Sequence, residues 1–448
     1  MDIKELYQLY KAHPCITTDS RNCPQGSIFL ALKGTSFNGN LFAGDALEKG
    51  CSYAIVEGDE APDENAFIEP GAEAMRASTV PRQSKGRMKR HDSFIRVSDT
   101  LQTFKDLARE HRRQFNIPVI AITGTNGKTT TKELVAAVLR EKYNVMATEG
   151  NFNNDVGVPK TLFRLQPEHE LAVIEMGASH PGDIRTLVET AEPTYGLITN
   201  VGRAHLEGFG SFEGVKKTKG ELYDFLATAG GTIFLNGSDE DLKEMARQRN
   251  VSACIPYTEG RVLRCDPFLV FEWEGHTIHT RLIGSYNLPN ALAAATVGLH
   301  FGVGAGEIVH ALESYTPANN RSQFLRTSRN GLIVDAYNAN PTSMRTALES
   351  FAGMEARDKM AILGDMRELG AASTGEHQKI VDFIETRQDS LGEVWLVGEE
   401  FGKTRTALHR FATTEDVTKE LQAQCPHGRT ILIKGSNGMK LYELPKLL

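Results

Sequence analysis

Apolar positions follow two alternating patterns along this chain, short continuous runs and runs with helical spacing. Residues 119–122 are apolar and mostly β-branched, which predicts a strand buried on both faces of a parallel sheet. The residues after it have apolar side chains at the spacing of a helix, at Leu134, Val135, Val138 and Leu139. Strand and helix patterns alternate in the same order further along the chain. We therefore predict an α/β fold with parallel sheets.

The chain of 448 residues is too long for one hydrophobic core and suits about three domains. We predict a small N-terminal α/β domain at 1–97, a central domain with a P-loop and a parallel sheet at 98–316, and a C-terminal Rossmann-like domain at 317–448. From about residue 58 to 92 the periodicity stops, and proline, serine and charge accumulate. We expect a mobile insertion there, because so few apolar side chains do not offset the entropy of ordering.

The composition of the chain says more about its binding partners than about its fold. The net charge of -7 and the pI near 6.0 give no extended positive field, so we expect no nucleic-acid partner. The six cysteines include no Cys-x-x-Cys pair, which argues against a zinc site or a disulfide framework. The sequence contains no apolar run of membrane-spanning length and no signal-peptide pattern. We expect a cytoplasmic monomer without membrane insertion.

The turn between the predicted strand at 119–122 and its helix has the sequence GTNGKTT, which begins at Gly124. Unpaired N–H groups at a helix N-terminus bind anions, and Gly124 and Gly127 allow phosphate oxygens to approach the backbone. We expect Lys128 to face solvent and reach the β- and γ-phosphates, and the Thr129 hydroxyl to bind Mg²⁺. Only two residues separate Gly124 from Gly127, so this is a variant of the usual P-loop. The turn predicts ATP and Mg²⁺ as ligands.

Two further predicted strands end in polar side chains. Glu175 ends one apolar run, and Asn200 and His205 follow the next. The carboxyl ends of parallel strands meet at one edge of a sheet, so these residues and the phosphate loop are predicted to share one crevice. A carboxylate and an imidazole without a thiol favour a second Mg²⁺ site over zinc. Considered singly, Glu175 equally suits a strand-end cap, and His205 is typical of an ordinary loop histidine.

Other polar residues at element ends allow two interpretations each. Lys219, near the start of a helix predicted at 216–226, is typical of a solvated helix residue. Asn287 and Asn290 either cap an alanine-rich helix or bind the edge of an adenine ring. Asp335 ends a strand and resembles the acidic residue that binds ribose hydroxyls, although no G-x-G-x-x-G sequence accompanies it.

The N-terminal domain has two polar turns of its own. One contains Asp19, Ser20 and Arg21, and the other contains Lys33 and residues 38–40. Taken alone, they are typical of ordinary Asx and glycine turns. Together in one small domain they are also compatible with a site for a nucleotide sugar.

The assembled motifs identify a family resemblance that extends over nearly the whole chain. GTNGKTT alone is shared by a wider superfamily, which includes folylpolyglutamate and cyanophycin synthetases. More specific motifs accompany it, namely NFNNDVGVP, EMGASHPGDI, ITNVGRAHLEGFGS, DAYNANPTSM, LGDMRELG and LIKGS. With them the chain resembles the Mur ligases of bacterial peptidoglycan synthesis, and among these the branch that adds D-alanyl-D-alanine.

This resemblance implies an activity and a domain layout. The expected reaction is ATP-dependent amide bond formation that joins D-alanyl-D-alanine to UDP-N-acetylmuramoyl-tripeptide through an acyl phosphate. The expected fold has an N-terminal UDP-binding domain, a central ATPase and a C-terminal Rossmann-like domain that closes over the site. Domain closure would protect the acyl phosphate from water.

The resemblance also implies roles for individual residues. Those implied to be catalytic are Lys128, His205 and Lys219. Those implied to bind ATP are Gly124, Thr125, Asn126, Gly127, Lys128, Thr129, Thr130, Asn287, Asn290, Arg321 and Asp335. Those implied to hold metal are Thr129, Glu175, His205 and Lys219, the last as a carbamate. Those implied to bind the other substrates are Asp19, Ser20, Arg21, Lys33, Asn151, Asn153, Asn154, Tyr337, Asn338, Asn340, Lys434 and Ser436.

The sequence departs from the family pattern in the insertion at 58–92 and at Asn437, where the family commonly has arginine after Lys-Gly-Ser. Two alternatives stay open. A folylpolyglutamate synthetase shares the phosphate loop, although the N-terminal TDSR and ALKG motifs argue against it. A catalytically silent nucleotide-binding scaffold is the other, and the joint presence of Lys128, Glu175, His205 and Lys219 argues against that.

Overall fold

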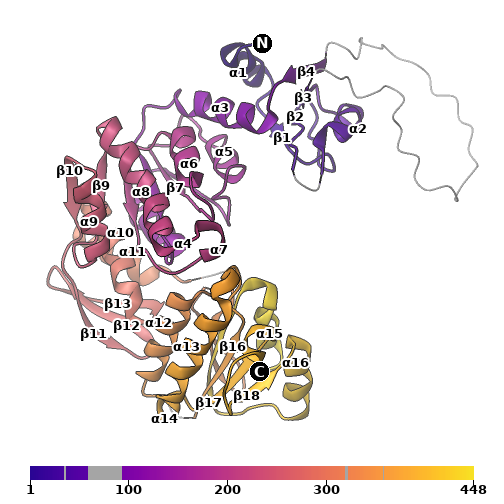
Figure 1. Ribbon diagram of the computed structural model, residues 1–448. Coiled ribbons are helices and arrows are strands. Elements are labelled where there is room, and N and C mark those ends of the chain that lie inside the picture. The colour runs from indigo at the N-terminus through magenta and orange to yellow at the C-terminus, as the bar shows by residue number, and fades with distance from the viewer. Residues whose placement is uncertain (35–36, 59–92, 318–320, 357) are drawn as a thin grey trace, which may run out of the picture. The chain divides into compact units, whose positions relative to one another are not determined.

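A computed structural model describes the chain at residues 1–34, 37–58, 93–317, 321–356 and 358–448 (Figure 1). These residues form two compact units, the first made of 1–116 with 155–163 and the second of 117–154 with 164–448. The predicted domain limits at 97 and 316 differ from the limits of these units and stay a prediction. The insertion predicted at 58–92 lies outside the described residues, apart from Gly58.

The first unit is a small parallel sheet with helices packed against it. Its strands are in the order β1-β2-β3-β4, with bounds Ile16–Thr17, Ile28–Leu30, Tyr53–Glu57 and Phe94–Val97. Its helices are α1 (Ile3–Ala12), η1 (Gly39–Phe42), α2 (Ala43–Lys49), α3 (Thr100–Arg112) and α5 (Gly157–Leu162). Leu6 and Tyr10 of α1 share a core with Phe104 and Leu107 of α3. The sequence prediction assigned this third helix to the central domain, whereas it lies in the first unit.

A six-stranded parallel sheet forms the centre of the second unit, in the order β10-β9-β8-β5-β7-β6. Its strands in chain order are β5 (Val119–Thr123), β6 (Val145–Ala147), β7 (Leu171–Glu175), β8 (Tyr195–Ile198), β9 (Thr232–Leu235) and β10 (Ala253–Pro256). Ile122 pairs with Glu175 and Thr123 with Ile198. The carboxyl ends of β5, β7 and β8 therefore lie side by side, as the sequence predicted.

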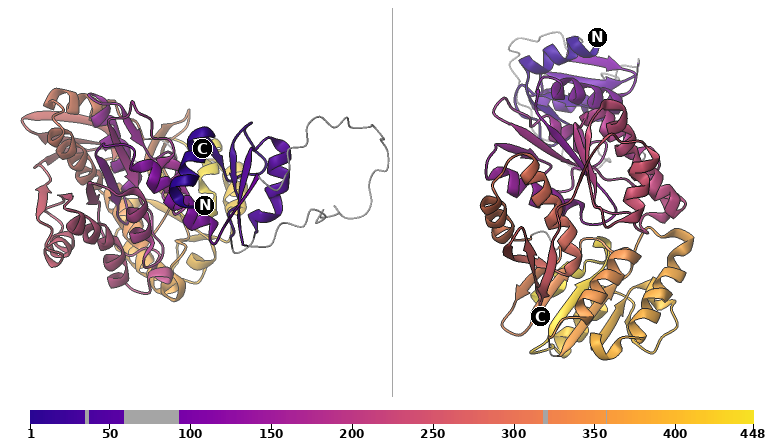
Figure 2. Two further views of the ribbon diagram at one scale, coloured as in Figure 1. Left: turned by 90° about the horizontal axis from the view of Figure 1, so that it is seen from above. Right: turned by 90° about the vertical axis from the view of Figure 1, so that its left-hand side faces the viewer.

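Helices cover both faces of the central sheet, and they can be followed in Figure 2. Leu197 of β8 packs into a core with α4 and α10, whereas the adjacent Gly196 faces Leu222 and Leu226 of α8. This alternation along one strand is what a sheet buried on both sides requires. The helices are α4 (Lys128–Arg140), α6 (Asp183–Ala191), α7 (Leu206–Phe209), α8 (Phe212–Ala229), α9 (Glu240–Gln248), η3 (Ser285–Asn287), α10 (Leu288–His300) and α11 (Ala305–Ser314).

The less regular β segment predicted before the alanine-rich helix is an antiparallel sheet, β11-β12-β13. Its strands are Arg261–Cys265, Phe268–Trp273 and His276–Ile283. Phe271 and Trp273 of β12 are buried in the same core as α4 and α10. This small sheet therefore extends the hydrophobic core of the central sheet.

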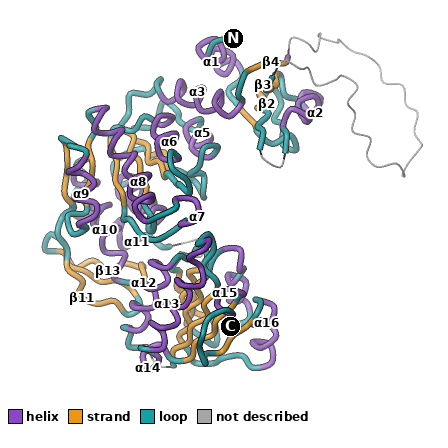
Figure 3. Tube along the Cα trace, in the orientation of Figure 1, coloured by secondary structure: helices purple, strands orange, loops and turns teal. Residues whose placement is uncertain are grey.

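The C-terminal sheet has the order β14-β15-β19-β16-β17-β18, and only the edge strand β14 is antiparallel. Its strands are β14 (Gln323–Arg326), β15 (Gly331–Asp335), β16 (Lys359–Gly364), β17 (Glu393–Val397), β18 (His409–Phe411) and β19 (Thr430–Lys434). Ile333 faces one core with α12 and α13, and its neighbours Leu332 and Val334 face another with α16. The predicted doubly wound arrangement is thus confirmed, and its strands are drawn in orange in Figure 3.

The helices around this sheet are α12 (Pro341–Ala352), η4 (Gly370–Ala372), α13 (Ser373–Glu385), α14 (Gln388–Leu391), α15 (Glu399–Gly402), α16 (Thr414–Ala423), η5 (Asn437–Met439) and η6 (Leu441–Lys446). Asn340 caps α12, since its side-chain oxygen accepts a hydrogen bond from the N–H of Ser343. No helix of the described residues combines the length and hydropathy that a membrane crossing needs.

Helix α8 begins earlier than predicted and is tied to α6 by a buried carboxylate. The helix starts at Phe212, where Ser211 caps it, so Lys219 lies well inside the helix. The carboxylate of Glu221 accepts hydrogen bonds from the N–H groups of Gly182 and Arg185, at 3.0 and 2.9 Å. These donors belong to the first turn of α6, where a negative charge is favourable. Glu221 thereby fixes the helix that carries Lys219.

We expect Glu221→Gln to destabilise the protein, because one amide oxygen replaces a charged, bidentate acceptor. The cost is about 1–2 kcal/mol, which lowers the Tm by about 2–4 °C or more. Glu213→Gln, on the exposed first turn of the same helix, is the matched control and should leave the Tm near that of the wild type. Thermal unfolding followed by fluorescence measures both, and equal Tm values for the two variants would contradict this role of Glu221.

Candidate functional site

The phosphate loop between β5 and α4 has the backbone that its sequence predicts. Gly124 and Gly127 have φ values of +143° and +79°, which disfavour any residue with a side chain. A Cβ atom on Gly124 would lie 2.0 Å from Oγ1 of Thr199, and one on Gly127 would lie 2.8 Å from Oδ1 of Asn290. Both positions therefore require glycine, and Gly127 directly precedes the first turn of α4, which contains Thr130.

Two residues at the end of β8 hold this loop in place. Thr199 Oγ1 and Asn200 Nδ2 both donate to the carbonyl oxygen of Asn126, at 2.6 and 3.0 Å. The N–H of Asn126 donates in turn to Oδ1 of Asn200, and the N–H of Thr125 to the Asn200 carbonyl. Asn200 was predicted at this sheet edge from the sequence, but Thr199 was not. The feature that could have revealed Thr199 is its hydroxyl group next to an asparagine at the end of a predicted strand.

Lys128 is half-buried, so the expectation that it faces solvent is wrong. Its Nζ donates to the carbonyl oxygens of Gly124 and Thr125 at 2.8 and 3.0 Å. Burial lowers the pKa of Lys128 to about 8, while the negative charge of Glu175 opposes this shift and the positive charge of Arg321 adds to it. The ammonium group is therefore held against the backbone of the loop, next to the predicted phosphate site.

Glu175 joins the loop helix to the segment after β6. Its carboxylate accepts from Thr129 Oγ1 at 2.8 Å and from Asn153 Nδ2 at 2.8 Å. The side chain is buried, with 1% of its surface exposed. Asn153, predicted as a substrate residue, thus orients this carboxylate. Glu175 is a buried acceptor beside the phosphate loop, and not merely a strand-end cap.

Lys219 is the least expected feature of the site. The residue is 2% exposed, which rules out the solvated-helix interpretation. Among the described residues its Nζ makes no hydrogen bond or ion pair, and it lies over the Phe209 ring at 5.6 Å from the centroid. Burial lowers the pKa of Lys219 well below its usual value, and the charge of Lys128 lowers it further, whereas Asp183 and Glu221 oppose the shift. The amine is thus disposed to be neutral.

His205 also lies beside Phe209, with 6.2 Å between the ring centroids. Its backbone is left-handed, at φ +49°. Nδ1 of His205 lies 2.6 Å from Oε2 of Glu368, a residue of the C-terminal sheet region. The hydrogen bond with His205 lowers the pKa of the Glu368 carboxyl. Glu368 was not singled out from the sequence, because no local pattern reveals a partner so distant along the chain.

The donor groups at the phosphate loop bear on the predicted metal site. Among the described residues, no three His, Cys, Asp or Glu side chains gather as a metal-binding group. The Thr129 hydroxyl and the Glu175 carboxylate nevertheless supply the hard oxygen ligands that Mg²⁺ prefers. Lys219 is a buried amine without a hydrogen-bond partner in the described chain, and its part in a metal site stays a prediction. The residues fit Mg²⁺ if Lys219 supplies an oxygen.

Asn287 and Asn290 hold the loop helix against α10. Asn290 Nδ2 donates to Asn287 Oδ1 at 2.8 Å, and its Oδ1 accepts from Thr131 Oγ1 at 3.0 Å. Asn287 Nδ2 donates to the Ile283 carbonyl, and its side chain makes no cap on α10. The capping interpretation is therefore wrong for Asn287, and contact with adenine stays a prediction.

Several predicted residues gather at the carboxyl ends of β15 and β19. Lys434 Nζ donates to Asp335 Oδ2 at 2.5 Å and to the Asn338 carbonyl at 3.3 Å. The Arg321 guanidinium stacks on the Tyr337 ring at 3.8 Å. The N–H of Ser322, next to Arg321, also donates to Asp335 Oδ1, so these four side chains and the Asn338 carbonyl lie near one another. No sequence pattern predicted the Asp335–Lys434 pair.

This cluster is linked to the phosphate loop by Asn340, whose Nδ2 donates to Asn126 Oδ1 at 2.8 Å. Ser436 Oγ accepts from the N–H of Arg367 at 2.9 Å, and Asn437 begins the short helix η5. The contact of Asn340 with Asn126 brings a predicted substrate residue onto the predicted ATP loop. The two sets of residues thus form parts of one site.

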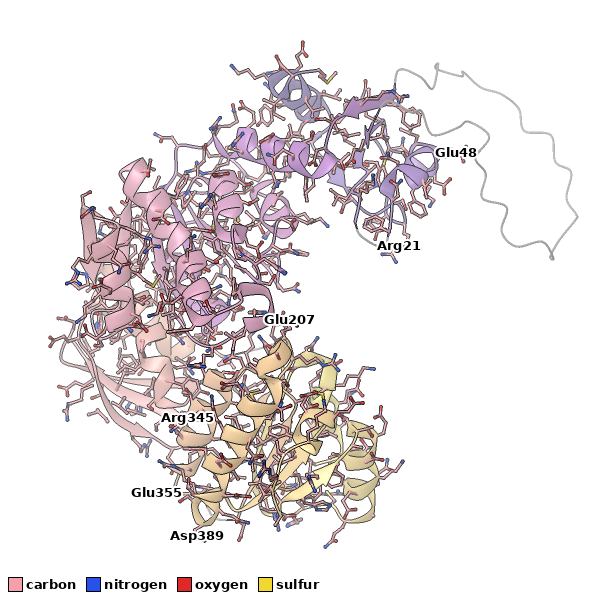
Figure 4. All side chains as sticks on the ribbon, in the orientation of Figure 1. Arg21, Glu48, Glu207, Arg345, Glu355 and Asp389 are labelled. Carbon is pink, nitrogen blue, oxygen red and sulfur yellow. The ribbon has the colours of Figure 1, made fainter. Side chains whose placement is uncertain are left out.

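The turn residues of the first unit have ordinary local roles. Arg21 Nε and Nη2 donate to the two carboxylate oxygens of Asp19, and the N–H of Arg21 closes an Asx turn on Asp19 Oδ1. These bonds lower the pKa of Asp19 to about 2. Figure 4 labels Arg21, whose side chain is 88% exposed. The turn interpretation is confirmed, and binding of a sugar nucleotide by Asp19, Ser20, Arg21 and Lys33 stays a prediction, as it does for Asn151 and Asn154 after β6.

Three family models match successive parts of the chain. They are described as "Mur ligase family, catalytic domain" at residues 14–112, "Mur ligase middle domain" at 122–298 and "Mur ligase, glutamate ligase domain" at 320–437. Together they span most of the chain.

Named relatives and a solved structure agree with these models. The UDP-N-acetylmuramoyl-tripeptide--D-alanyl-D-alanine ligases of Bacillus subtilis and Escherichia coli are 30% and 31% identical to it, covering 96% and 97% of this chain and 92% and 93% of their own. The crystal structure of MurF from Acinetobacter baumannii superposes with a TM-score of 0.81 at 29% identity, covering 98% of this chain and 97% of that one. MurF from Thermotoga maritima in complex with ADP has the same fold, with a TM-score of 0.78 at 24% identity and 96% of each chain covered. The chain therefore belongs to the Mur ligase family.

Proposed function

We propose that this protein joins D-alanyl-D-alanine to UDP-N-acetylmuramoyl-tripeptide with ATP, as a step of peptidoglycan precursor synthesis. The observation that carries the proposal is the group of side chains around the phosphate loop, where Lys128 lies near Glu175, which accepts from Thr129, and near the buried Lys219. The names of the relatives at 30% identity or more over nearly the whole chain supply the substrates. A cytoplasmic monomer is part of the same proposal.

The chemistry needs two anions to approach each other. The terminal carboxylate of the tripeptide attacks the γ-phosphorus of ATP, which forms an acyl phosphate and releases ADP. The amine of D-alanyl-D-alanine then attacks the acyl carbon, an amide bond forms, a proton leaves the nitrogen, and inorganic phosphate departs. Lys128 and the N–H groups of the loop lower the repulsion in the first step, so positioning and charge carry the catalysis.

Lys219 is proposed to act as a carbamate. A neutral lysine amine attacks CO₂, a nitrogen–carbon bond forms, and a proton is released. Burial and the charge of Lys128 lower the pKa of Lys219, which favours the neutral form of the amine that reacts with CO₂. The resulting carboxylate would complete the oxygen donors of Thr129 and Glu175, and His205 would add an imidazole. Mg²⁺ held there would neutralise charge on the phosphate oxygens of ATP.

The remaining predicted contacts are proposed on the same basis. We propose that Arg321, which stacks on Tyr337, contacts the ATP phosphates. Asp335 accepts a hydrogen bond from Lys434 and still has carboxylate lone pairs that could accept from the ribose hydroxyls. The first unit is proposed to bind the uridine nucleotide. A folylpolyglutamate synthetase is the weaker alternative, because the folylpolyglutamate synthase structure of Mycobacterium tuberculosis matches 78% of this chain at 14% identity and supports the fold alone.

The first test is phosphate release with defined substrates. We expect phosphate release to require ATP, UDP-N-acetylmuramoyl-tripeptide and D-alanyl-D-alanine together. Parallel assays with diaminopimelate or lysine at the third position of the peptide measure the preference between these two residues. Folate with glutamate is the control pair and should give no release above background. Release with folate, or release that does not depend on D-alanyl-D-alanine in the presence of either tripeptide, would contradict the proposal.

The second test concerns Lys128. We expect Lys128→Met to lower kcat by about 100-fold or more, because a charge that faces the transferred phosphoryl group is lost. Its fold should persist, since Thr199 and Asn200 also hold the loop. Lys419→Met, at an exposed position of α16, is the control and should keep full activity. Near-normal turnover by folded Lys128→Met would refute the assigned role.

The third test concerns Lys219. We expect Lys219→Ala to lose most activity and to regain part of it with added acetate or formate, which replace the missing carboxylate. Lys219→Arg should stay inactive in the same solutions, because its permanent cation occupies the position. Initial rates against acetate concentration measure the effect. Full activity of the alanine variant without acetate would exclude the carbamate role.

A further inference from the structure

The segment 366–370, with the sequence MRELG, follows β16 and reaches the central sheet. Glu368 Oε2 lies 2.6 Å from Nδ1 of His205, and the two residues have left-handed backbones at φ +65° and +49°. Such conformations cost energy for residues with a side chain, and they persist where the surrounding structure determines them. Glu368 is 60% exposed in its side chain, so packing does not account for its position.

Three neighbouring contacts fix this segment independently of Glu368. The N–H of Met366 donates to Nε2 of the fully buried His377 at 3.0 Å, whose Nδ1 is bonded to the Ser373 carbonyl at 2.8 Å. The N–H of Arg367 donates to Ser436 Oγ. Gly370 packs against Glu207, which is labelled in Figure 4. The backbone of the segment is therefore held at both ends when Glu368 meets His205.

The contact with Glu368 determines which nitrogen of His205 is available. A carboxylate at Nδ1 keeps the proton on that nitrogen and leaves the lone pair on Nε2. Among the described residues Nε2 has no hydrogen-bond partner. Histidines that bind metals commonly donate their second ring N–H to a carboxylate, which fixes the ring and raises its basicity. Glu368 stands in this relation to His205.

We propose that Glu368 is a positioning residue that orients His205 for a divalent cation, so that cation affinity depends on the segment 366–370 of the C-terminal sheet region. This inference rests on the proposed metal role of His205. It adds a residue from outside the central sheet to the site, and it makes binding of the cation sensitive to contact between the two sheet regions.

The experiment measures Mn²⁺ binding to the full-length protein with ADP, from the electron paramagnetic resonance signal of free Mn²⁺. We expect Glu368→Ala to weaken binding by about 10-fold, and Glu368→Gln to weaken it less, because the amide oxygen still accepts from Nδ1. In a His205→Ala background, Glu368→Ala should add nothing, since the two residues act as one unit. Glu349→Ala, an ion-paired exposed glutamate of α12, is the control.

The outcomes separate this inference from the proposed function. The positioning role is overturned if Glu368→Ala binds Mn²⁺ with unchanged affinity. It is also overturned if Glu368→Ala lowers the Mn²⁺ affinity by the same factor in the His205→Ala background. Neither result would bear on the proposed ligase activity. Failure of the wild type to bind Mn²⁺ with ADP would overturn the metal site itself and this inference with it. The positioning role is supported if the wild type binds Mn²⁺ and is fully active as a ligase, and if Glu368→Ala changes only the affinity for the cation.

Discussion

Desolvation of two lysines beside the buried carboxylate of Glu175 is the constraint on which the site depends. Burial lowers the pKa of both Lys128 and Lys219, and the positive charge of Lys128 lowers the pKa of Lys219 further. Glu175 is 1% exposed and is bonded to Thr129 and Asn153 rather than to either lysine. The positive charges of Lys128 and Arg321 act on each other at the loop, and an anionic ligand of several charges, such as a nucleoside triphosphate, would relieve that repulsion.

The fold makes this crowding possible because the strand ends are fixed by register. Pairing of β5 with β7 and β8 places Glu175 next to the strand that leads into the loop, and places Thr199 and Asn200 on the other side of it. The loop needs left-handed backbone at Gly124 and Gly127, and the neighbouring side chains then occupy the space where a Cβ atom would lie. Strand register, glycine and hydrogen bonds thus determine one backbone path. A one-residue slip between the strands would separate the carboxylate from the loop.

Sequence reasoning reached the parts of the structure that depend on local patterns. The P-loop strand and helix, the shared sheet edge and the doubly wound C-terminal sheet follow from apolar periodicity and turn residues, and the structure confirms them. The burial of Lys219 and the pairing of Asp335 with Lys434 do not follow, because they depend on which helices and strands become neighbours. The helix at Thr100–Arg112 illustrates the same limit, since its pattern gives a helix but not the unit that it joins.

The two lysines show why residue type alone is a weak guide to function. In sequence, Lys128 follows a glycine turn and Lys219 lies in an amphipathic helix, and the second is typical of a solvated side chain. In the structure Lys219 is buried and Lys128 is half-buried, but only Lys128 has carbonyl acceptors within reach, at 2.8 and 3.0 Å. An ammonium group without acceptors is costly in a buried site, whereas a neutral amine is tolerated. The same burial that makes Lys219 a poor cation therefore favours the neutral amine, which is the form that the proposed reaction with CO₂ requires.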